Sequence, residues 1–596
     1  MAYFKRDRFS GIAPGVAPRL LSEQFGQIAE NVDLESGRLV ATKQDSDQYS
    51  LSTATKSSIY LYNSGGVNRW LEWAESGVKA VEGPIPGDTT DRLYFTGAYQ
   101  APANYPRVGN ASTLISGTSY YPVNSYRLGV PAPQDTPTTT VTGTADDTAI
   151  PNEVSYVYTF VTSFGEEGPP SPAAAIISLT DTETVEVSTP SDSSGASGLN
   201  FGSGALKRLY RSNTGSTNTT FQFVDEAAYS ASSITDNKDA ANLGEVLPSA
   251  DWIGPPDDNT SLYPDGPLQG LIPLAQGVMA GFTGKRFCLS ESFLPHAWPI
   301  AYRITTEEDI VAIASTANGV VALTDGQPYF ITGTDPSSMT AIRVDLAQAC
   351  VNTNSVVDMG DYVLYASPDG LCAVQSSSGE VISKGLISVQ QWNSSFYPTL
   401  IKAFKHEGTY VAFWTNGSSH GGWIFDPRGS ENALTTFDVV SEVRGGYSDP
   451  KTGELYIIQG SKIKKFRDPT QSSDVLTFKS KKFVTPNPVS MGWVSVNAND
   501  YPVYLKVWGD GHILLDLTIG FNTVTKLYSA VGTFYTQGSA PGNFISNTIS
   551  SGSPTVLHEP IVRMPPVLAQ EWEIQVRGKD INEFCLAQSM DEIRGT

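Results

Sequence analysis

The chain has 596 residues and a net charge of −22, with 40% hydrophobic and only 17% charged residues. This length predicts two to four domains, and the hydrophobic content argues against disorder caused by charge. The negative charge argues against a surface that holds nucleic acid by neutralising phosphates. It is compatible with a passage through which DNA slides, and solubility alone also explains it.

The N-terminal part, residues 1–130, is predicted to hold a short leading segment and the first blades of a β-propeller. Residues 25–32 are expected to form a short helical turn. Two strand–turn–strand patterns follow at 57–75 and 91–108. Residues 1–15 lack the apolar segment of a signal peptide, and no run of about 20 apolar residues is present to span a bilayer.

Residues 131–249 differ in composition from their surroundings and predict a separate module. A Pro/Thr-rich linker at 129–143 leads into alternating runs such as "EVSYVYTFV" and "ALKRLY". About seven short strands in such a segment are typical of a small Greek-key sandwich. A mere loop of this length would be uncommon. We therefore predict a sandwich inserted into the propeller.

Residues 250–474 repeat one design, in which two apolar runs flank a tight turn. The turns carry Asp-Gly, Asn-Gly or Gly-Ser, which tolerate positive φ in hairpins. Successive units start 43, 48 and 44 residues apart, near the roughly 40–50 residues of one propeller blade. Stacked blades bury the faces that a lone hairpin leaves exposed; two unrelated β-sandwiches are the alternative. The units begin at Gly319, Tyr362, Tyr410 and Glu454, after a strand–turn–strand pattern at 270–292.

After residue 474 the blade spacing stops, while alternation continues in "PVYLKVWGDGHILLDLTI" and "EWEIQVRG". Residues 475–596 therefore predict a further β domain at the C-terminus. Helices are expected to be few, with a second short turn in "DPSSMTAIRV" and a surface segment in "MDEIRGT". The predicted fold class is all-β.

No sequence motif indicates catalysis. H-E-x-x-H, G-x-S-x-G and P-loop patterns do not occur. Glu307, Glu308 and Asp309 form an acidic run, but neighbours on a strand point to opposite faces. We expect a solvated turn there rather than the paired carboxylates of a hydrolase. The histidines, which share no ligand spacing, are His296, His406, His420, His512 and His558.

Metal and ligand signals are equally weak. The Asp146–Asp147 and Asp257–Asp258 pairs lack the spacing of a calcium loop. The segment "SPDGLC" at 367–372 matches part of the Asp-box of sialidase propellers but lacks its Thr-Trp. We predict no catalytic, cofactor-binding or metal-binding residue and no cofactor. The cysteines have no zinc-ligand spacing and are expected to be buried free thiols in a reducing cytoplasm: Cys288, Cys350, Cys372 and Cys585.

Six tryptophans lie in predicted strands, where packing between blades is expected and a sugar-binding platform is the alternative. They are Trp70, Trp73, Trp414, Trp423, Trp493 and Trp508.

Several segments resemble proteins of tailed bacteriophages. Within 131–249, "GEEGPPSP" and the later "KRLYRS", "FQFVDE" and "SITD" resemble fibronectin type III modules of phage structural proteins. The segment "AENVDLESGRLVATK" (Ala29–Lys43) is similar to the opening of phage tail proteins, and residues 254–299 resemble a segment that opens a blade in them. Together these features resemble the nozzle, or tail tubular protein B-like, component of short-tailed bacteriophages.

This resemblance implies a β-propeller with an inserted fibronectin type III-like sandwich and a C-terminal β domain. It implies a structural virion protein, not an enzyme, that is made in the host cytoplasm and forms the distal tail tube. The implied assembly is a homohexameric ring below the portal and adaptor proteins. DNA would leave through its lumen without tight binding, and fibres or spikes would dock on its flank.

Two other functions stay open. The chain could be a receptor- or glycan-binding propeller of a fibre or spike adaptor, which would expose a Trp/Tyr cluster. It could also be a propeller hydrolase, which would need carboxylates converging on one rim.

Overall fold

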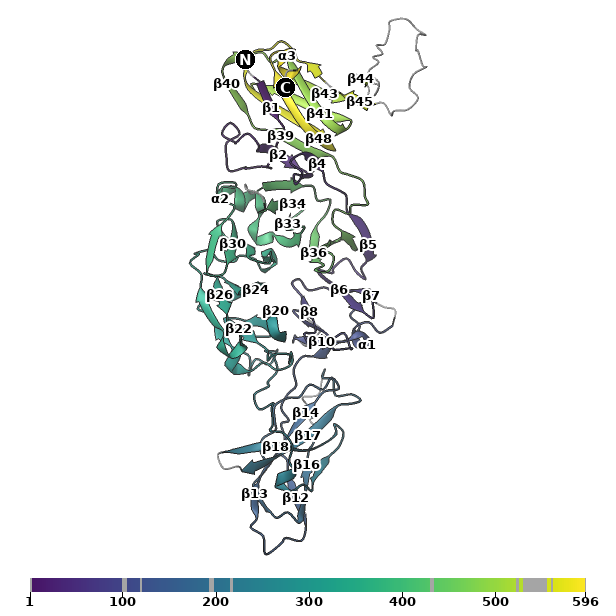
Figure 1. The fold of residues 1–596 in the computed structure, drawn as a ribbon, viewed down its shortest axis with the longest axis vertical. Helices are drawn as coiled ribbons and strands as arrows, with labels where there is room; N and C mark the ends of the chain where they lie inside the picture. Colours follow the sequence, from purple (N-terminus) through teal and green to yellow (C-terminus); the bar gives the residue numbers. More distant parts are fainter. Residues whose placement is uncertain are drawn as a thin grey trace. The chain divides into compact units, whose positions relative to one another are not determined.

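The computed structural model describes residues 3–98, 104–117, 120–191, 198–214, 218–428, 433–520, 525–528, 555–558 and 561–594. It is mostly β, with 47% strand and 6% helix. The chain forms two compact units, which are described separately (Figure 1). Unit 1 comprises Met1–Tyr49, Ile382–Val443 and Pro450–Thr596, and unit 2 comprises Ser50–Val381 and Arg444–Asp449.

Apart from residues 131–249 and strand β36 (Val443–Ser448), unit 2 is a series of antiparallel sheets, each built from strands that follow one another in the chain (Figure 1). This local connectivity is typical of propeller blades. Its strands are β6 (Ser58–Ser64), β7 (Val67–Trp73), β8 (Lys79–Glu82), β9 (Leu93–Thr96), β10 (Arg107–Gly109), β11 (Tyr126–Arg127), β20 (Gln269–Pro273), β21 (Met279–Thr283), β22 (Arg286–Leu289), β23 (Ile304–Thr305), β24 (Ile310–Thr316), β25 (Gly319–Thr324), β26 (Tyr329–Thr332), β27 (Thr340–Arg343), β28 (Val357–Asp358), β29 (Val363–Ala366), β30 (Leu371–Gln375), β31 (Ser378–Val381) and β36 (Val443–Ser448).

Each of these sheets packs on its neighbours through alternating side chains. In β25, Val320 and Ala322 join a core with Phe287 of β22. The intervening Val321 joins a second core with Tyr365 of β29. Because side chains of a strand alternate between two faces, a sheet covered on both sides needs an unbroken apolar run. The sequence "VVAL" at 320–323 meets that need.

The segment 131–249, called the insert below, lies in the chain between the β8–β11 and β20–β23 sheets. These two sheets share a core, in which Tyr94 and Met279 are fully buried. The ends of the insert meet as well: a Cβ on Gly129 would lie 2.7 Å from the Cα of Gly254. The insert therefore leaves and returns to the blades at one point.

Two three-stranded sheets, β12-β16-β19 and β14-β17-β18, form most of the insert, and β13 pairs with β15. Tyr156, Val185 and Leu209 are fully buried in one core that draws on both sheets. The strands are β12 (Thr139–Gly143), β13 (Asn152–Val154), β14 (Tyr156–Val161), β15 (Ile177–Leu179), β16 (Glu183–Ser188), β17 (Leu206–Thr214), β18 (Thr219–Ala228) and β19 (Ser233–Asp236).

Unit 1 joins both ends of the chain. One sheet has the order β3-β4-β48-β41-β46, with β1 also paired to β48, and another has the order β32-β33-β34-β35-β2-β39-β47-β42-β43. Its strands are β1 (Tyr3–Arg6), β2 (Gly26–Glu30), β3 (Val32–Asp33), β4 (Leu39–Ala41), β5 (Ser46–Ser50), β32 (Lys402–His406), β33 (Thr409–Asn416), β34 (Ser419–Asp426), β35 (Ala433–Phe437), β37 (Leu455–Gln459), β38 (Lys462–Lys465), β39 (Leu476–Ser480), β40 (Phe483–Val489), β41 (Trp493–Asp500), β42 (Val503–Gly509), β43 (His512–Ile519), β44 (Thr525–Tyr528), β45 (Thr555–His558), β46 (Ile561–Arg563), β47 (Ala569–Gly578) and β48 (Asp580–Ala587).

Helices are short, and none in the described part of the chain is long and apolar enough to cross a membrane. The α-helices are α1 (Ala111–Leu114), α2 (Val389–Gln391) and α3 (Met590–Arg594), and a π-helical turn covers Trp392–Phe396. The 3-10 turns are Ala240–Asn242, Ala275–Gly277, Ile300–Tyr302, Pro336–Ser338, Thr353–Ser355 and Pro398–Leu400.

The predicted hairpins are present in the structure as the antiparallel pairs β25–β26, β29–β30, β33–β34 and β37–β38. Two local predictions were wrong. Residues 270–292 contain three strands rather than two, because the segment after Pro273 turns before β21 begins. Residues 25–32 form strand β2 rather than a helical turn, because Ala29 and Glu30 pair with β39.

Candidate functional site

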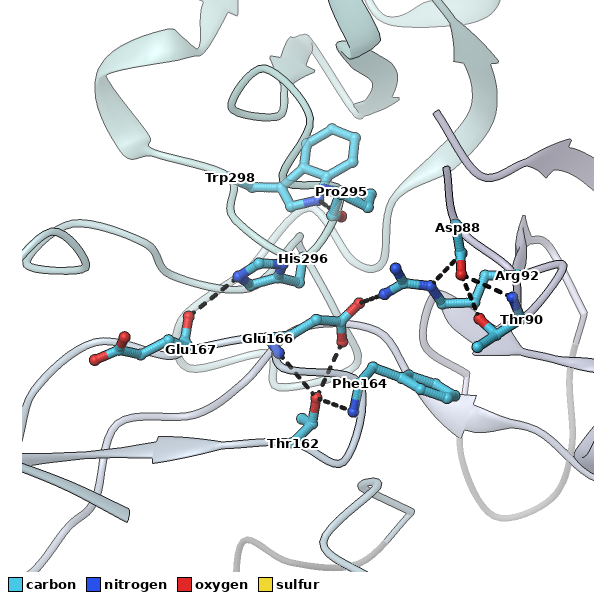
Figure 2. A network of polar contacts seen from close by, with 10 residues as sticks. All are labelled: Asp88, Thr90, Arg92, Thr162, Phe164, Glu166, Glu167, Pro295, His296 and Trp298. Carbon is cyan, nitrogen blue, oxygen red and sulfur yellow. Dashed lines mark hydrogen bonds and ion pairs between the residues drawn. The ribbon is translucent and has the colours of Figure 1, made fainter. Parts of the chain in front are cut away.

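The most developed polar cluster of unit 2 lies where the insert meets the blades (Figure 2). We call it the insert junction. It brings together the insert loop after β14, the loop before β9 and the loop after β22. Its members are Asp88, Thr90, Arg92, Thr162, Phe164, Glu166, Glu167, Pro295, His296 and Trp298.

The insert loop has a shape that its own residues impose. The hydroxyl of Thr162 accepts hydrogen bonds from the N–H groups of Phe164 and Glu166, both at 3.3 Å. Gly165, with φ of 77°, allows the chain to turn, and its N–H donates to the Thr162 carbonyl at 2.9 Å. The turn places two successive glutamates in the interior.

Glu166 extends from this loop to the blade side of the junction. Its Oε1 accepts from Nη1 of Arg92 at 3.3 Å, and Nε of Arg92 donates to Oδ2 of Asp88 at 2.6 Å. The guanidinium carbon also lies 5.4 Å from the ring centroid of Phe164. One arginine thus connects a blade carboxylate, an insert carboxylate and an insert aromatic ring.

Burial and hydrogen bonding shift the pKa values of Glu166 and Asp88 in opposite directions. Burial dominates at Glu166. It raises the pKa of Glu166 to about 7, because the attraction of Arg92 only partly offsets the loss of solvent. Burial would also raise the pKa of Asp88, but hydrogen bonds from Thr90 and Arg92 outweigh it and lower that pKa. Asp88 therefore stays ionised near neutral pH, whereas Glu166 can take up a proton there.

Glu167 turns back into the insert. Its Oε1 accepts from the hydroxyls of Thr159 and Tyr210, both at 2.7 Å, and its Oε2 accepts from Arg208 at 2.9 Å. With these partners, a carboxylate that is 3% exposed is well satisfied. The side chain therefore anchors the loop to β14 and β17.

The backbone of Glu167 reaches the blades. Nε2 of His296 lies 3.1 Å from the Glu167 carbonyl oxygen and donates to it, so the proton of the neutral ring sits on Nε2. Burial lowers the pKa of His296 to about 4. Its Nδ1 has no hydrogen-bond partner among the described residues. The neighbouring Trp298, only 1% exposed, belongs to the core of the flanking sheets.

The junction contains a carboxyl and an imidazole, but both groups are buried between the insert and the blade loops. Glu166 is 5% exposed and His296 is 2% exposed, so a substrate has no path to either group. General acid–base catalysis needs a group within hydrogen-bond reach of a substrate. What the cluster does is hold the insert against two blades.

The acidic run forms an exposed bend just before β24, as expected. Glu307 and Glu308 both bind Arg343, at 3.1 and 3.3 Å, and Glu308 also accepts from the Tyr329 hydroxyl at 3.0 Å. Because these residues precede β24 and do not lie in it, both carboxylates can contact the same arginine. An arginine between the two carboxylates makes this an ion-pair cluster.

Three of the four aspartates in the two pairs form contacts within the protein. Asp146 accepts from the backbone and hydroxyl of Thr148. Asp257 pairs with Arg127, and Asp258 accepts from the N–H of Asn104. Within the described ranges, no group of three or more His, Cys, Asp or Glu side chains is placed to hold a metal ion.

The other singled-out side chains are scattered over both units, and some are buried while others are partly exposed. All four cysteines are free and buried, as predicted, and the six tryptophans lie in strands β7, β33, β34, β41 and β42. The histidines do not converge: His296 and His406 are buried, His420 contacts Thr415 and His512 is exposed. The side chain of His558 lies outside the described residues. The residues of "SPDGLC" form the β29–β30 turn.

The insert junction itself was not predicted. The glutamates of "GEEGPPSP" were interpreted only as part of a turn. The only signal was an acidic pair at the Gly/Pro turn of the insert, and it does not stand out among the many other charged residues of this segment.

Comparison with known proteins finds only distant structural similarity. No family model and no curated protein matches the chain. The solved structures that it resembles include the WD40 domain of coronin from Toxoplasma gondii (TM-score 0.24, 10% identity, 46% of this chain and 65% of that one). The extracellular domain of a hybrid two-component system from B. thetaiotaomicron gives TM-score 0.20 and 10% identity over 70% of this chain and 51% of that one.

A further similar structure is YCF48 from Cyanidioschyzon merolae, with TM-score 0.23 and 12% identity over 66% of this chain and 97% of that one. The chain is thus mostly β, with structural similarity to β-propeller proteins. It spans less than two thirds of the coronin and two-component chains. Matches of this kind carry no argument about activity or partners.

Proposed function

We propose that this protein is a structural component of the tail of a short-tailed bacteriophage, assembling into a ring that forms the distal tail tube. The observation that carries the proposal is the combination of phage-like segments with a blade-and-insert organisation. The segment 29–43 resembles the opening of phage tail proteins. The sheets stack in chain order, and a separate module emerges between two of them.

The insert junction supports the same proposal. A docking arm for fibres or adaptor proteins must transmit force to the body of the ring. Here Arg92, Glu166 and His296 connect the arm to two different blade loops by buried polar contacts. Buried charged pairs favour one geometry because breaking them leaves an uncompensated charge.

The charge of the chain is consistent with a conduit for DNA. Each copy would bring a net charge of −22 to the ring. An acidic lumen repels phosphates and so lets the duplex slide. The assembled ring should therefore retain DNA weakly, even at low salt, and tight low-salt retention would contradict a sliding lumen.

The decisive experiment is the mass of the purified chain in solution, alone and with portal–adaptor assemblies. Light scattering and electron microscopy should find rings of about six copies, formed alone or on the adaptor. A protein that stays monomeric and ignores the adaptor would refute the proposal. If that monomer bound host glycans, the receptor-binding function would replace it.

A further inference from the structure

Unit 1 contains a cavity of about 260 Å³ that no part of the proposed function uses. It lies among β33, β35, the β37–β38 hairpin and the segment after β4. Phe413, Phe437 and Ile457 provide apolar wall. Val440, which is 93% exposed, also lines it, so the apolar surface continues to solvent. We call it the Arg467 cavity.

Arg467 follows β38 directly and carries the charge that distinguishes this cavity. Its N–H donates to Oδ1 of Asp45 at 2.9 Å. Its guanidinium carbon lies 5.2 Å from the ring centroid of Phe466 and 5.7 Å from that of Phe437. Two aromatic faces therefore fix the guanidinium without consuming its hydrogen-bond donors.

One nitrogen of this guanidinium, Nη2, is not satisfied by the described residues. Nη2 is buried and has no acceptor among the described residues, and no described carboxylate forms an ion pair with Arg467. Burial lowers the pKa of Arg467 to about 10, so it is still a cation at neutral pH. Buried charged donors are normally paired, and an unpaired one at a cavity wall indicates a missing acceptor.

The acceptor should be a single negative charge. Lys43 and Lys464 also line the cavity, but so do Asp45, Asp438 and Asp474. These charges nearly balance. A phosphate group, at about −1.5 to −2, would be repelled by the carboxylates more strongly than a carboxylate ligand at −1.

The polar side chains around the arginine are held in place by one another. Asn31 donates to Asp438 at 3.3 Å, and Gln44 donates to Asp474 at 3.0 Å. Gln459 donates to the Ser441 carbonyl at 3.1 Å. Fixed amides and carboxylates beside an apolar wall suit a ligand that has several hydroxyls and one apolar face.

We propose that the Arg467 cavity binds one carboxylate-bearing sugar ring, such as a uronic acid residue of an acidic polysaccharide. The planar carboxylate would pair with the guanidinium fork of Arg467, and the ring hydroxyls would meet the amide and carboxylate groups. The volume, just below the usual range of ligand pockets, limits the ligand to about one ring. This proposal is independent of the nozzle assignment.

The test is calorimetric titration of the full chain with sodium glucuronate, glucose and inorganic phosphate in parallel. Glucuronate should bind, and glucose and phosphate should bind at least about tenfold more weakly. Arg467→Gln should weaken glucuronate binding by about tenfold or more, since it removes the fork. Lys464→Ala, at a half-buried position, should weaken it less.

A matched control is Arg343→Gln, which removes an arginine from an ion pair in unit 2 and should leave glucuronate binding unchanged. Thermal unfolding and circular dichroism establish that each variant is folded. The proposal is overturned if glucuronate fails to bind the wild-type chain. It is also overturned if phosphate binds as tightly, or if folded Arg467→Gln and Lys464→Ala both bind like the wild type.

Discussion

Glu166 and His296 should give unit 2 opposing responses to pH. Glu166 ionises near 4.5 when unfolded and near 7 when folded. A raised folded pKa means that its stabilisation is complete below 4.5 and is lost as the pH rises through 7. At about 1.4 kcal/mol for each tenfold change in proton affinity, the loss is about 3 kcal/mol.

His296 acts in the opposite direction. Its pKa falls from 6.5 when unfolded to about 4 when folded. Its contribution is therefore complete above 6.5 and is lost as the pH falls through 4, again by about 3 kcal/mol. Between pH 4.5 and 6.5 the two contributions should nearly cancel, and above 6.5 the Glu166 loss continues alone.

Glu166→Gln separates the two effects. In the variant, the unfolding free energy should rise from pH 4 to 6.5 because of His296. The fall that Glu166 causes in the wild type should be absent. The difference between the wild type and the variant isolates Glu166, because other titrating groups cancel. Chemical denaturation at several pH values, followed by tryptophan fluorescence, measures it. Parallel profiles for the two proteins from pH 5 to 7.5 would refute an elevated Glu166 pKa.

Three further changes test the fold. Phe287→Ala removes a fully buried ring between two sheets and should lower the unfolding free energy by about 3–5 kcal/mol in denaturant titrations. Asp236→Ala leaves Arg211 buried without its partner at 2.8 Å and should cost about 3–5 kcal/mol, whereas an unchanged midpoint would mean that the pair is unimportant. Burial raises the pKa of Cys288 and Cys350 to about 12, so iodoacetamide at pH 8 should label neither in the native protein and both in denaturant, as mass spectrometry would show.

Local patterns in the sequence predicted the hairpins because each depends on residues close together in the chain. The turn at Asp369–Gly370, for example, lies between apolar runs that pair with each other in β29 and β30. Pairing over long distances left no such signal. Tyr3 lies opposite Ala587 in β1 and β48, and β2 became a strand because β39 lies beside it.

The polar clusters were harder to predict for the same reason. The structural role of Glu166 depends on its ion pair with Arg92, and Arg92 lies in a different module. Arg467 appears in the sequence as one more basic residue of "KKFRDP", and only the packing of Phe437 and Phe466 shows that its guanidinium is fixed at a cavity. The spacing of residues along the chain does not predict such contacts between distant segments.

The close approach of Gly129 and Gly254 has a consequence for how this protein can change. A Cβ on Gly129 would lie 2.7 Å from the Cα of Gly254, so there is no room for a side chain where the chain enters and leaves the insert. The insert is held there and at the insert junction, through Arg92 and His296. Such a module can be exchanged with its neighbours left in register, because the flanking sheets share a core, as long as the new module again covers Arg92 and His296. The residues at the base of the insert are therefore constrained, while the rest of its surface can change without altering the sheets that carry it.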